Sequence, residues 1–270
     1  MIEIIKGDCL QSLKKLEDQS INTCVTSPPY WGLRNYNDEE KQLGMEDTIE
    51  KFVENLVKVF REVKRVLRED GTVWLNLGDT YLQNKQLVGI PWRVALALQQ
   101  DGWYLRQDII WHKPNPMPEA VKDRCVKSHE YIFLFSLKPR YYFDYKAIQE
   151  PAAYAGDNRS LRNDARRDEP MANAIAANTQ PTQEFRNKRS IWTINTAQSG
   201  EAHFAVFPEK IPELCIKAGT KEGDVVLDPF MGSGTTASVA QRLGRKWIGI
   251  ELNEEYAQII NKKTAQGELF

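Results

Sequence analysis

The sequence predicts an α/β fold in which a twisted, mostly parallel sheet is covered by helices on both faces. Short apolar segments alternate with amphipathic ones along most of the chain. A glycine-rich loop joins a strand to a helix near the C-terminus, and one long polar segment interrupts the alternation. The 270 residues are 41% hydrophobic, which suits one large domain or one domain with an insertion.

The alternation begins at the N-terminus. Residues 2–5 are mostly apolar and predict a strand, and the leucines at 10, 13 and 16 favour a short helix after it. Residues 22–25 predict a second strand, which ends at two consecutive prolines.

The clearest helix covers residues 49–67, where apolar side chains recur every three or four positions. Asp47 or Thr48 is expected to cap its start, and Gly71 to close its end. The run "TVWLNL" at 72–77 then predicts a strand.

Later elements continue the βα order, because Pro91 suits the first turn of a helix and Gly102 its end. The other expected strands are 104–111, 131–137, 225–227 and 246–251, and the other expected helix is 235–243.

A glycine loop, "DPFMGSGTT", follows the strand that ends at Asp228. Gly232 and Gly234 permit a tight turn and a close backbone approach to a ligand, and Glu251 ends the next strand. The spacing is G-x-G-x-x-A, so this segment predicts a site for an adenosine-containing cofactor. A carboxylate such as Asp228 repels a pyrophosphate and attracts an ammonium group, which favours S-adenosylmethionine over a dinucleotide.

The position of this loop also bears on the fold. Only a short stretch of chain follows Gly234, so the other βα units of the sheet must come from the N-terminal part. The sequence therefore predicts a permuted sheet whose cofactor half is encoded last.

A second motif, "TSPPYW" at 26–31, ends the strand at 22–25. Proline fixes φ near −65°, lacks an N–H and restricts the residue before it, so the backbone here is stiff. Taken alone, the motif is typical of a proline-rich turn that closes a strand. Beside a cofactor site, its rigid acceptors and aromatic rings suit the recognition of a flat substrate.

Residues 151–190 hold few large apolar side chains and carry several basic ones. Composition supports two interpretations equally, a disordered loop or an insert that orders on a polyanion. The basic residues are Arg159, Arg162, Arg166, Arg167, Arg186, Lys188 and Arg189.

Charge and cysteine content exclude several classes of protein. The net charge of −1 rules out a uniformly polybasic nucleic-acid binder, so DNA contacts require a local patch. The four cysteines are scattered without CxxC pairs, so neither a metal site nor a disulfide framework is expected. The sequence contains neither a signal peptide nor a membrane span, and we expect a reduced, cytoplasmic protein.

Together, "TSPPY" followed by "DPFMGSGTT" resembles the β-class, permuted DNA amino-methyltransferases that use S-adenosylmethionine. The resemblance extends over nearly the whole chain and includes the order of the two motifs. It implies a Rossmann-like methyltransferase fold, a double-stranded DNA partner, and a bacterial, archaeal or phage origin with association to the nucleoid through DNA. Family members often form dimers, so a homodimer is compatible with it; no metal is implied.

The resemblance also implies an organisation and a set of site residues. Residues 1–144 would form the catalytic half, 145–200 a target-recognition insert and 201–270 the cofactor half. The implied catalytic residues are Ser27, Pro28, Pro29 and Tyr30. The implied cofactor residues are Asp8, Cys9, Phe207, Asp228, Pro229, Phe230, Gly232, Gly234, Thr235, Glu251 and Leu252. Lys113, Arg124 and Lys127, together with the basic residues of 151–190, are candidate DNA contacts, although such charges are commonly part of a solvated face.

The expected reaction transfers a methyl group to the exocyclic amine of a flipped base. In this family "TSPPY" accompanies N4 of cytosine more often than N6 of adenine, so cytosine is slightly favoured. Three alternatives stay open: a methyltransferase on RNA or a protein amide, a dehydrogenase that uses G-x-G-x-x-A, and a non-catalytic DNA-binding regulator.

Overall fold

The computed structural model describes residues 2–32, 42–152, 184–197 and 208–266. The chain divides into two compact units. Unit 1 comprises Met1–Asp144 and Ser190–Phe270, and unit 2 comprises Tyr145–Arg189.

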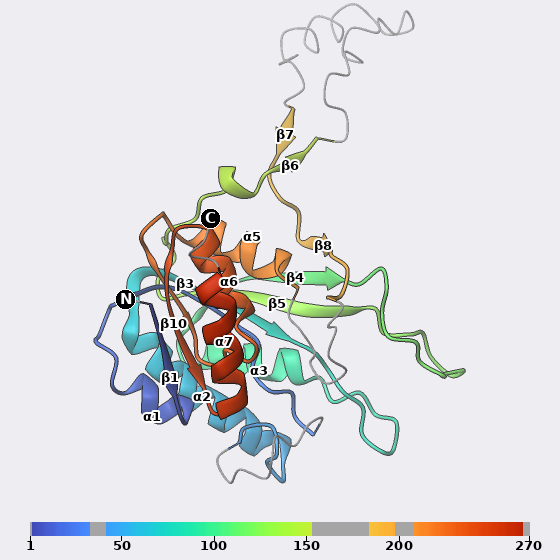
Figure 1. The fold of residues 1–270 in the computed structure, drawn as a ribbon. Coiled ribbons are helices and arrows are strands. Elements are labelled where there is room, and N and C mark those ends of the chain that lie inside the picture. The colour runs from blue at the N-terminus through green and yellow to red at the C-terminus, as the bar shows by residue number, and fades with distance from the viewer. Residues whose placement is uncertain (1, 33–41, 153–183, 198–207, 267–270) are drawn as a thin grey trace, which may run out of the picture. The chain divides into compact units, whose positions relative to one another are not determined.

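Eight of the described strands form one mixed sheet in unit 1 (Figure 1). All neighbouring strands pair in parallel except β5, which is antiparallel to both β3 and β4. The prediction of a mostly parallel sheet is therefore confirmed. In spatial order the strands are β1 (Ile2–Lys6), β10 (Lys246–Glu251), β9 (Val225–Asp228), β2 (Ile21–Thr26), β3 (Leu67–Leu77), β5 (His129–Ser136), β4 (Tyr104–His112) and β8 (Ile191–Thr193).

The strand order confirms the permutation. The first strand of the chain, β1, pairs with β10, so that Ile2 lies opposite Trp247. On its other side β10 pairs with β9, and β9 pairs with β2. The last two strands of the chain thus lie between the first two, as a cofactor half encoded last requires.

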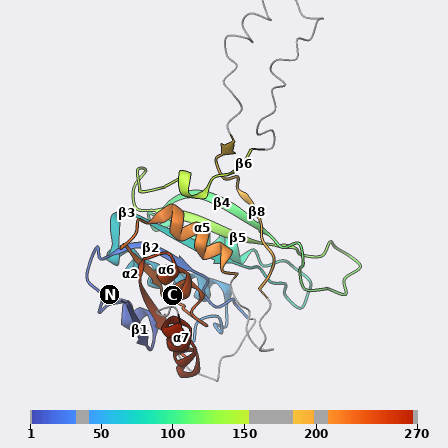
Figure 2. The ribbon, with the colours of Figure 1, turned by 45° about the horizontal axis from the view of Figure 1, so that its top comes forward.

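Helices cover both faces of this sheet (Figures 1 and 2). One layer packs α1, α2 and α3 in sequence, and the other packs α5, α6 and α7. The bounds are α1 (Cys9–Leu13), α2 (Ile49–Val66), α3 (Ile90–Gln100), α5 (Lys210–Gly219), α6 (Thr235–Arg242) and α7 (Glu254–Gln266).

Helix α2 buries the apolar face that its sequence predicts, and the Thr48 hydroxyl caps its first turn. The expected closure by Gly71 is wrong, because the helix passes directly into β3 at Leu67. Gly71 lies within β3, where a Cβ atom would be 2.8 Å from the carbonyl oxygen of Asn22. The absence of a side chain there allows β2 and β3 to approach each other.

Unit 2 contains a short 3₁₀ helix, Lys146–Ile148, and a two-stranded antiparallel sheet. Its strands are β6 (Glu150–Pro151) and β7 (Phe185–Arg186). The unit ends at Arg189, whereas the expected insert extended to residue 200. The difference arises because β8 pairs with β4 and thereby joins residues 191–193 to the main sheet.

No helix in the described part of the chain is both long and apolar enough to span a bilayer. The described ranges also contain no group of three or more His, Cys, Asp or Glu side chains that could hold a metal ion. Cys9, Cys24 and Cys215 are buried free thiols, and Cys125 is exposed.

Candidate active site

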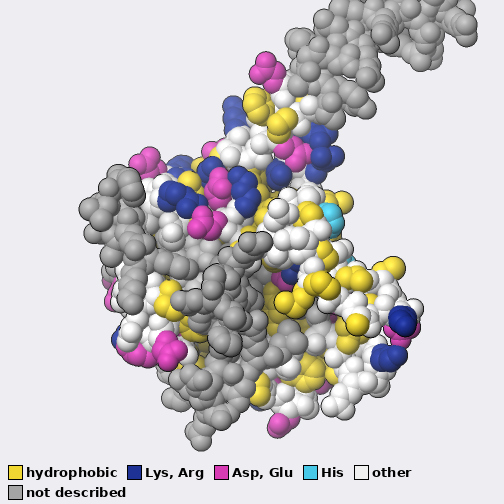
Figure 3. Space-filling model, turned by 45° about the vertical axis from the view of Figure 1, so that its right-hand side comes forward, with side chains coloured by type: hydrophobic (Ala, Val, Ile, Leu, Met, Phe, Trp, Pro, Cys, Tyr) yellow, Lys and Arg dark blue, Asp and Glu magenta, His cyan; other side chains and the backbone are white. Residues whose placement is uncertain are grey.

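The predicted motifs meet at one edge of the sheet. β1, β10, β9, β2 and β3 are parallel neighbours, so the segments that follow their carboxyl ends lie side by side. The glycine loop follows β9, and Ser27–Tyr30 follow β2, the adjacent strand. Hydrophobic side chains gather on the side of the molecule turned toward the viewer in Figure 3, with charged side chains among them.

Asp228 joins the two motifs directly. Its carboxylate accepts hydrogen bonds from the Thr26 hydroxyl at 2.6 Å, the Thr236 hydroxyl at 2.7 Å and the Phe230 amide at 3.1 Å. Only 4% of the residue is exposed, and this burial raises the pKa of the Asp228 carboxyl to about 6. Because Thr26 immediately precedes Ser27, this contact fixes the glycine loop to the Ser27–Tyr30 segment.

Both loop glycines are left-handed, with φ of +53° at Gly232 and +82° at Gly234. A Cβ atom at Gly234 would lie 2.8 Å from Cγ1 of Ile260 in α7. The Gly232 amide donates to Oε2 of Glu251 at 2.7 Å, and the Asn253 amide donates to Oε1 at 2.8 Å. Glu251 is thus an acceptor at the loop that is partly removed from water, and this burial raises the pKa of its carboxyl.

The segment after β1 completes this side of the site. The Gly7 amide donates to the Glu251 carbonyl at 2.9 Å, which places Asp8 and Cys9 beside the end of β10. Asp8 caps α1 by accepting from the Gln11 amide at 2.9 Å. Burial raises the pKa of the Cys9 thiol to about 12, so this sulfur is neutral at physiological pH.

Tyr30 lies in a hydrogen-bond network at the ends of three strands. Its hydroxyl donates to Oε2 of Glu130 at 2.6 Å. The Asn76 amide group lies 2.9 Å from the Tyr30 hydroxyl, 2.8 Å from Oε2 of Glu130 and 3.3 Å from Oγ of Ser27. Burial and the neighbouring Glu130 raise the pKa of the Tyr30 phenol well above its usual value, so the phenol stays protonated.

The ring of Tyr30 lies directly against Gly78, where a Cβ atom would come within 2.5 Å of Cε2. On the other side of the network, Lys113 forms an ion pair with Oε1 of Glu130. The same ammonium lies 4.3 Å from the ring centroid of Trp111. Trp31 packs against the hydrophobic core, and its indole N–H donates to the Glu46 carbonyl at 2.8 Å.

Asn76, in β3, and Asp79, just after this strand, make different contacts. Asn76 contacts both Ser27 and Tyr30. Asp79 instead accepts from the amides of Gly89 and Ile90 at 2.9 and 3.0 Å and so holds the start of α3.

The candidate DNA contacts that the structure describes are paired with carboxylates. Lys113 pairs with Glu130, Arg124 with Glu119 at 2.7 Å, and Lys127 lies 3.9 Å from Asp79. In unit 2, the side chains of Arg186, Lys188 and Arg189 converge on Glu150 at 2.6–3.2 Å. Arg159, Arg162, Arg166, Arg167 and the cofactor candidate Phe207 lie outside the described residues.

Sequence reasoning missed Glu130 and the threonines that hold Asp228. The signal for Glu130 is a lone acidic residue at the start of an otherwise apolar strand, "HEYIFLFS". Thr26 and Thr236 each occupy a buried position, where a hydroxyl must find a partner. Only the structure shows that the two hydroxyls donate to the same carboxylate, that of Asp228.

The fold and the site define an α/β enzyme with a strand-end cofactor loop next to a rigid Ser-Pro-Pro-Tyr segment. Residues 21–262 match the family described as DNA methylase, N6/N4 type. The chain is 42% identical to the Type II methyltransferase M.SmaI of Serratia marcescens, over 97% of this chain and 90% of that one. It is also 42% identical to M.Cfr9I of Citrobacter freundii, over 98% and 88%.

Two solved structures share the fold. A putative DNA modification methylase of Thermus thermophilus, complexed with S-adenosyl-L-methionine, has a TM-score of 0.67 at 26% identity, over 99% of this chain and 96% of that one. PvuII DNA methyltransferase, described as cytosine-N4-specific, has a TM-score of 0.72 at 22% identity, over 97% and 85%.

The chain therefore belongs to the N6/N4 DNA methylase family. It is an S-adenosylmethionine-dependent DNA methyltransferase that modifies an exocyclic amine of cytosine or adenine. The predictions of fold class, cofactor and reaction are confirmed at this level.

Proposed function

We propose that the enzyme methylates N4 of cytosine in duplex DNA at the site formed by Ser27–Tyr30 and the glycine loop. The hydrogen bond between Thr26 and Asp228 carries the proposal, because it fixes the catalytic segment next to the cofactor loop. Cytosine is favoured over adenine because the segment is Thr-Ser-Pro-Pro-Tyr, the form that accompanies N4 methylation more often.

The loop fits the cofactor in shape and polarity. Gly232 and Gly234 let the backbone come close to a ligand, and Glu251 offers carboxylate oxygens at the end of β10 for hydroxyl groups. S-adenosylmethionine, when bound, supplies the electrophilic methyl group of its sulfonium. Asp8, Cys9, Pro229, Phe230, Thr235 and Leu252 would border it, and Asp228 would act through its negative charge and by holding the loop.

Ser27 and Pro28 would act on the target amine. The amine is a poor nucleophile because its lone pair is delocalised into the ring. The Ser27 hydroxyl and the Pro28 carbonyl would accept its N–H bonds, favour a pyramidal nitrogen and stabilise the positive charge that develops there. No described residue donates a backbone hydrogen bond to the Pro28 carbonyl. Pro29 lacks an N–H and fixes the direction of that carbonyl.

Tyr30 would stack on the flipped base and offset part of the cost of unstacking it, at about 1–3 kcal/mol per stacked base. Unit 2 and the segment up to residue 200 would recognise the target sequence. There, the side chains of Arg186, Lys188 and Arg189 gather around Glu150 and would contact phosphates.

The test supplies labelled S-adenosylmethionine to the enzyme with duplex DNA, RNA and protein in parallel. We expect the wild type to transfer label to DNA alone. We expect Tyr30→Ala to retain cofactor binding but to lose most of its methylation activity. Label in RNA or protein, or near-normal turnover of Tyr30→Ala, would contradict the proposal. Sedimentation of the same preparation tests the expected homodimer, and localisation in cells tests the expected association with the nucleoid.

A further inference from the structure

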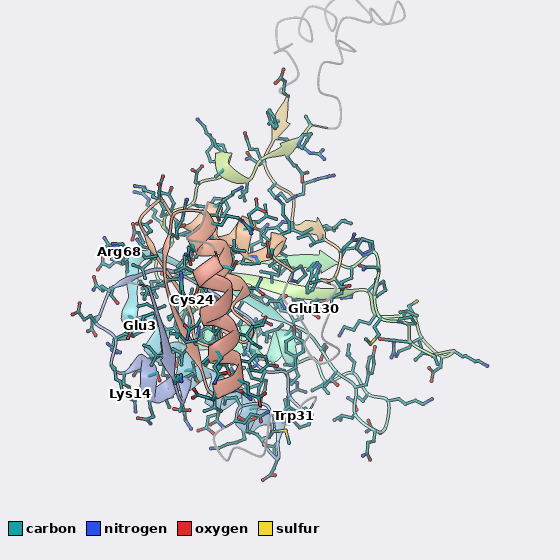
Figure 4. The ribbon with its side chains drawn as sticks, viewed as in Figure 1. Glu3, Lys14, Cys24, Trp31, Arg68 and Glu130 are labelled. Atoms are coloured by element: carbon teal, nitrogen blue, oxygen red, sulfur yellow. The ribbon has the colours of Figure 1, made fainter. Side chains whose placement is uncertain are left out.

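Glu130 is a charged group beside the catalytic segment that the proposed reaction does not use. It lies at the start of β5, and its side chain is only 14% exposed. Figure 4 shows Glu130 on the same side of unit 1 as Trp31, the residue after Tyr30. A carboxylate this far out of water needs both a counter-ion and hydrogen-bond donors.

The structure supplies both. Oε2 of Glu130 accepts from the Tyr30 hydroxyl at 2.6 Å and from the Asn76 amide at 2.8 Å. Oε1 pairs with Lys113, whose side chain is 18% exposed and whose ammonium lies over the Trp111 ring. A hydrogen bond from a neutral hydroxyl to a carboxylate is among the stronger ones in proteins, so the phenol is firmly held.

We propose that Glu130 is a positioning residue that holds Tyr30 in the orientation needed to stack on the flipped base, with Lys113 as its counter-ion. The inference rests on the proposed role of Tyr30. The ring lies against Gly78, and its hydroxyl is hydrogen-bonded to both Glu130 and Asn76. Without Glu130 the hydroxyl keeps only the Asn76 amide, which Glu130 itself orients, so the ring can rotate about its side-chain bonds.

The hydrogen bonds among Tyr30, Asn76 and Glu130 extend across three neighbouring strands of the sheet. Tyr30 lies after β2, Asn76 near the end of β3 and Glu130 at the second position of β5, and these three strands are neighbours in that order. The orientation of Tyr30 is therefore set by the rigid edge of the sheet rather than by its own loop. Rigid support matters because a misplacement of about 1 Å can slow a reaction by about 100-fold.

A different role for Glu130 is direct recognition of the target, since a carboxylate can accept from the amino group of cytosine. Both of its oxygens are already engaged, however, one by two donors and the other by an ammonium. The geometry therefore favours an action through Tyr30 over contact with the base.

The experiment is a double-mutant cycle between Glu130→Ala and Tyr30→Phe, read as single-turnover methyl transfer to duplex DNA. Each single variant is expected to slow transfer by about 10- to 100-fold while cofactor affinity stays unchanged. The double variant is expected to be no slower than the slower single one, because both remove the same contact. A 2-aminopurine base at the target position should change its fluorescence in both single variants in the same way, since it reports stacking on the ring.

Two further variants keep the result interpretable. Glu130→Gln combined with Lys113→Met retains an acceptor for Tyr30 and removes the unpaired cation, so most of the rate should return. Glu62→Gln is the matched control, because Glu62 is an ion-paired residue of α2 with 22% side-chain exposure and should have wild-type rates. If Glu130→Ala does not fold, the methylation rates of Tyr30→Phe and Glu130→Gln/Lys113→Met are compared instead. A slow Tyr30→Phe beside a nearly wild-type Glu130→Gln/Lys113→Met supports the role of the hydrogen bond, and equal rates contradict it.

Losses that multiply in the double variant, or wild-type rates in Tyr30→Phe, would overturn the inference. A parallel loss of cofactor affinity and thermal stability in the Glu130 variants would also overturn it, since that pattern indicates a structural role. Tyr30→Ala separates the two proposals. Near-normal turnover of that variant refutes the catalytic role of Tyr30, whereas an inactive Tyr30→Ala with a fully active Tyr30→Phe refutes only the role of Glu130.

Discussion

Asp228→Asn is expected to stabilise the free protein at neutral pH while it weakens cofactor binding. Asp228 is 4% exposed, and burial raises its pKa from 3.8 to about 6. An acid whose pKa is raised by folding binds more protons in the folded state, so stability falls as pH rises from about 4 to about 6. An asparagine has the same shape without the charge and removes this dependence.

The magnitude follows from the two pKa values. A shift of about two units corresponds to about 3 kcal/mol of unfolding free energy once the carboxyl is fully ionised. At pH 5 the same shift contributes about half as much, because most of the folded population is still protonated. The advantage of Asp228→Asn over the wild type should therefore grow by about 1 kcal/mol between pH 5 and pH 8.

Urea unfolding of both proteins at pH 5, 6, 7 and 8, without cofactor, measures this difference. Asp224→Asn, at the entrance to the same strand, is a matched control for loss of an aspartate. A stability difference that is constant between pH 5 and pH 8 would refute the reasoning, because it would place the Asp228 pKa near its unfolded value. Calorimetry with S-adenosylmethionine should show weaker binding to Asp228→Asn, and unchanged affinity would remove Asp228 from the cofactor site.

Two glycine substitutions and one charge reversal test other parts of the site. Gly78→Ala should abolish methylation but spare cofactor binding, because its Cβ would lie 2.5 Å from Cε2 of Tyr30; an active variant would show that the ring can move without loss. Gly234→Ala should lower the unfolding free energy by more than about 1 kcal/mol, since φ is +82° and the Cβ would overlap Ile260; urea unfolding measures it, and wild-type stability would contradict the strained geometry. Arg189→Glu should weaken binding to duplex DNA and flatten its salt dependence, and an unchanged salt slope in a fluorescence titration would exclude a phosphate contact there.

Much of the fold follows from local signals. Periodicity located α2, and turn residues located β9 and α6, because these elements carry their own caps and apolar faces. β8 has only three residues and lacks such a signal. It forms because β4 offers a free edge, and a pairing between segments so far apart cannot be predicted from local residue patterns. The closure of α2 by Gly71 was predicted wrongly for the same reason, since β3 begins at Leu67 and its pairing with β2 takes Gly71 into the sheet.

The two motifs were predicted from residue chemistry and order, but the contacts between them were not. Asp228 was interpreted as a ligand for an ammonium group, and the structure adds that Thr26 and Thr236 hold it. Lys113 was considered for phosphate contact, whereas its ammonium pairs with Glu130. Each contact joins residues far apart in sequence that the strand order brings together.

The identity of the methylated nucleoside tests the central claim most directly. Duplex DNA from cells that express the enzyme, digested to nucleosides and resolved by mass spectrometry, should contain N4-methylcytosine. The modification should be absent from cells that express Tyr30→Ala. N6-methyladenine in its place would contradict the proposed base, and DNA without a methylated amine would contradict the catalytic account as a whole.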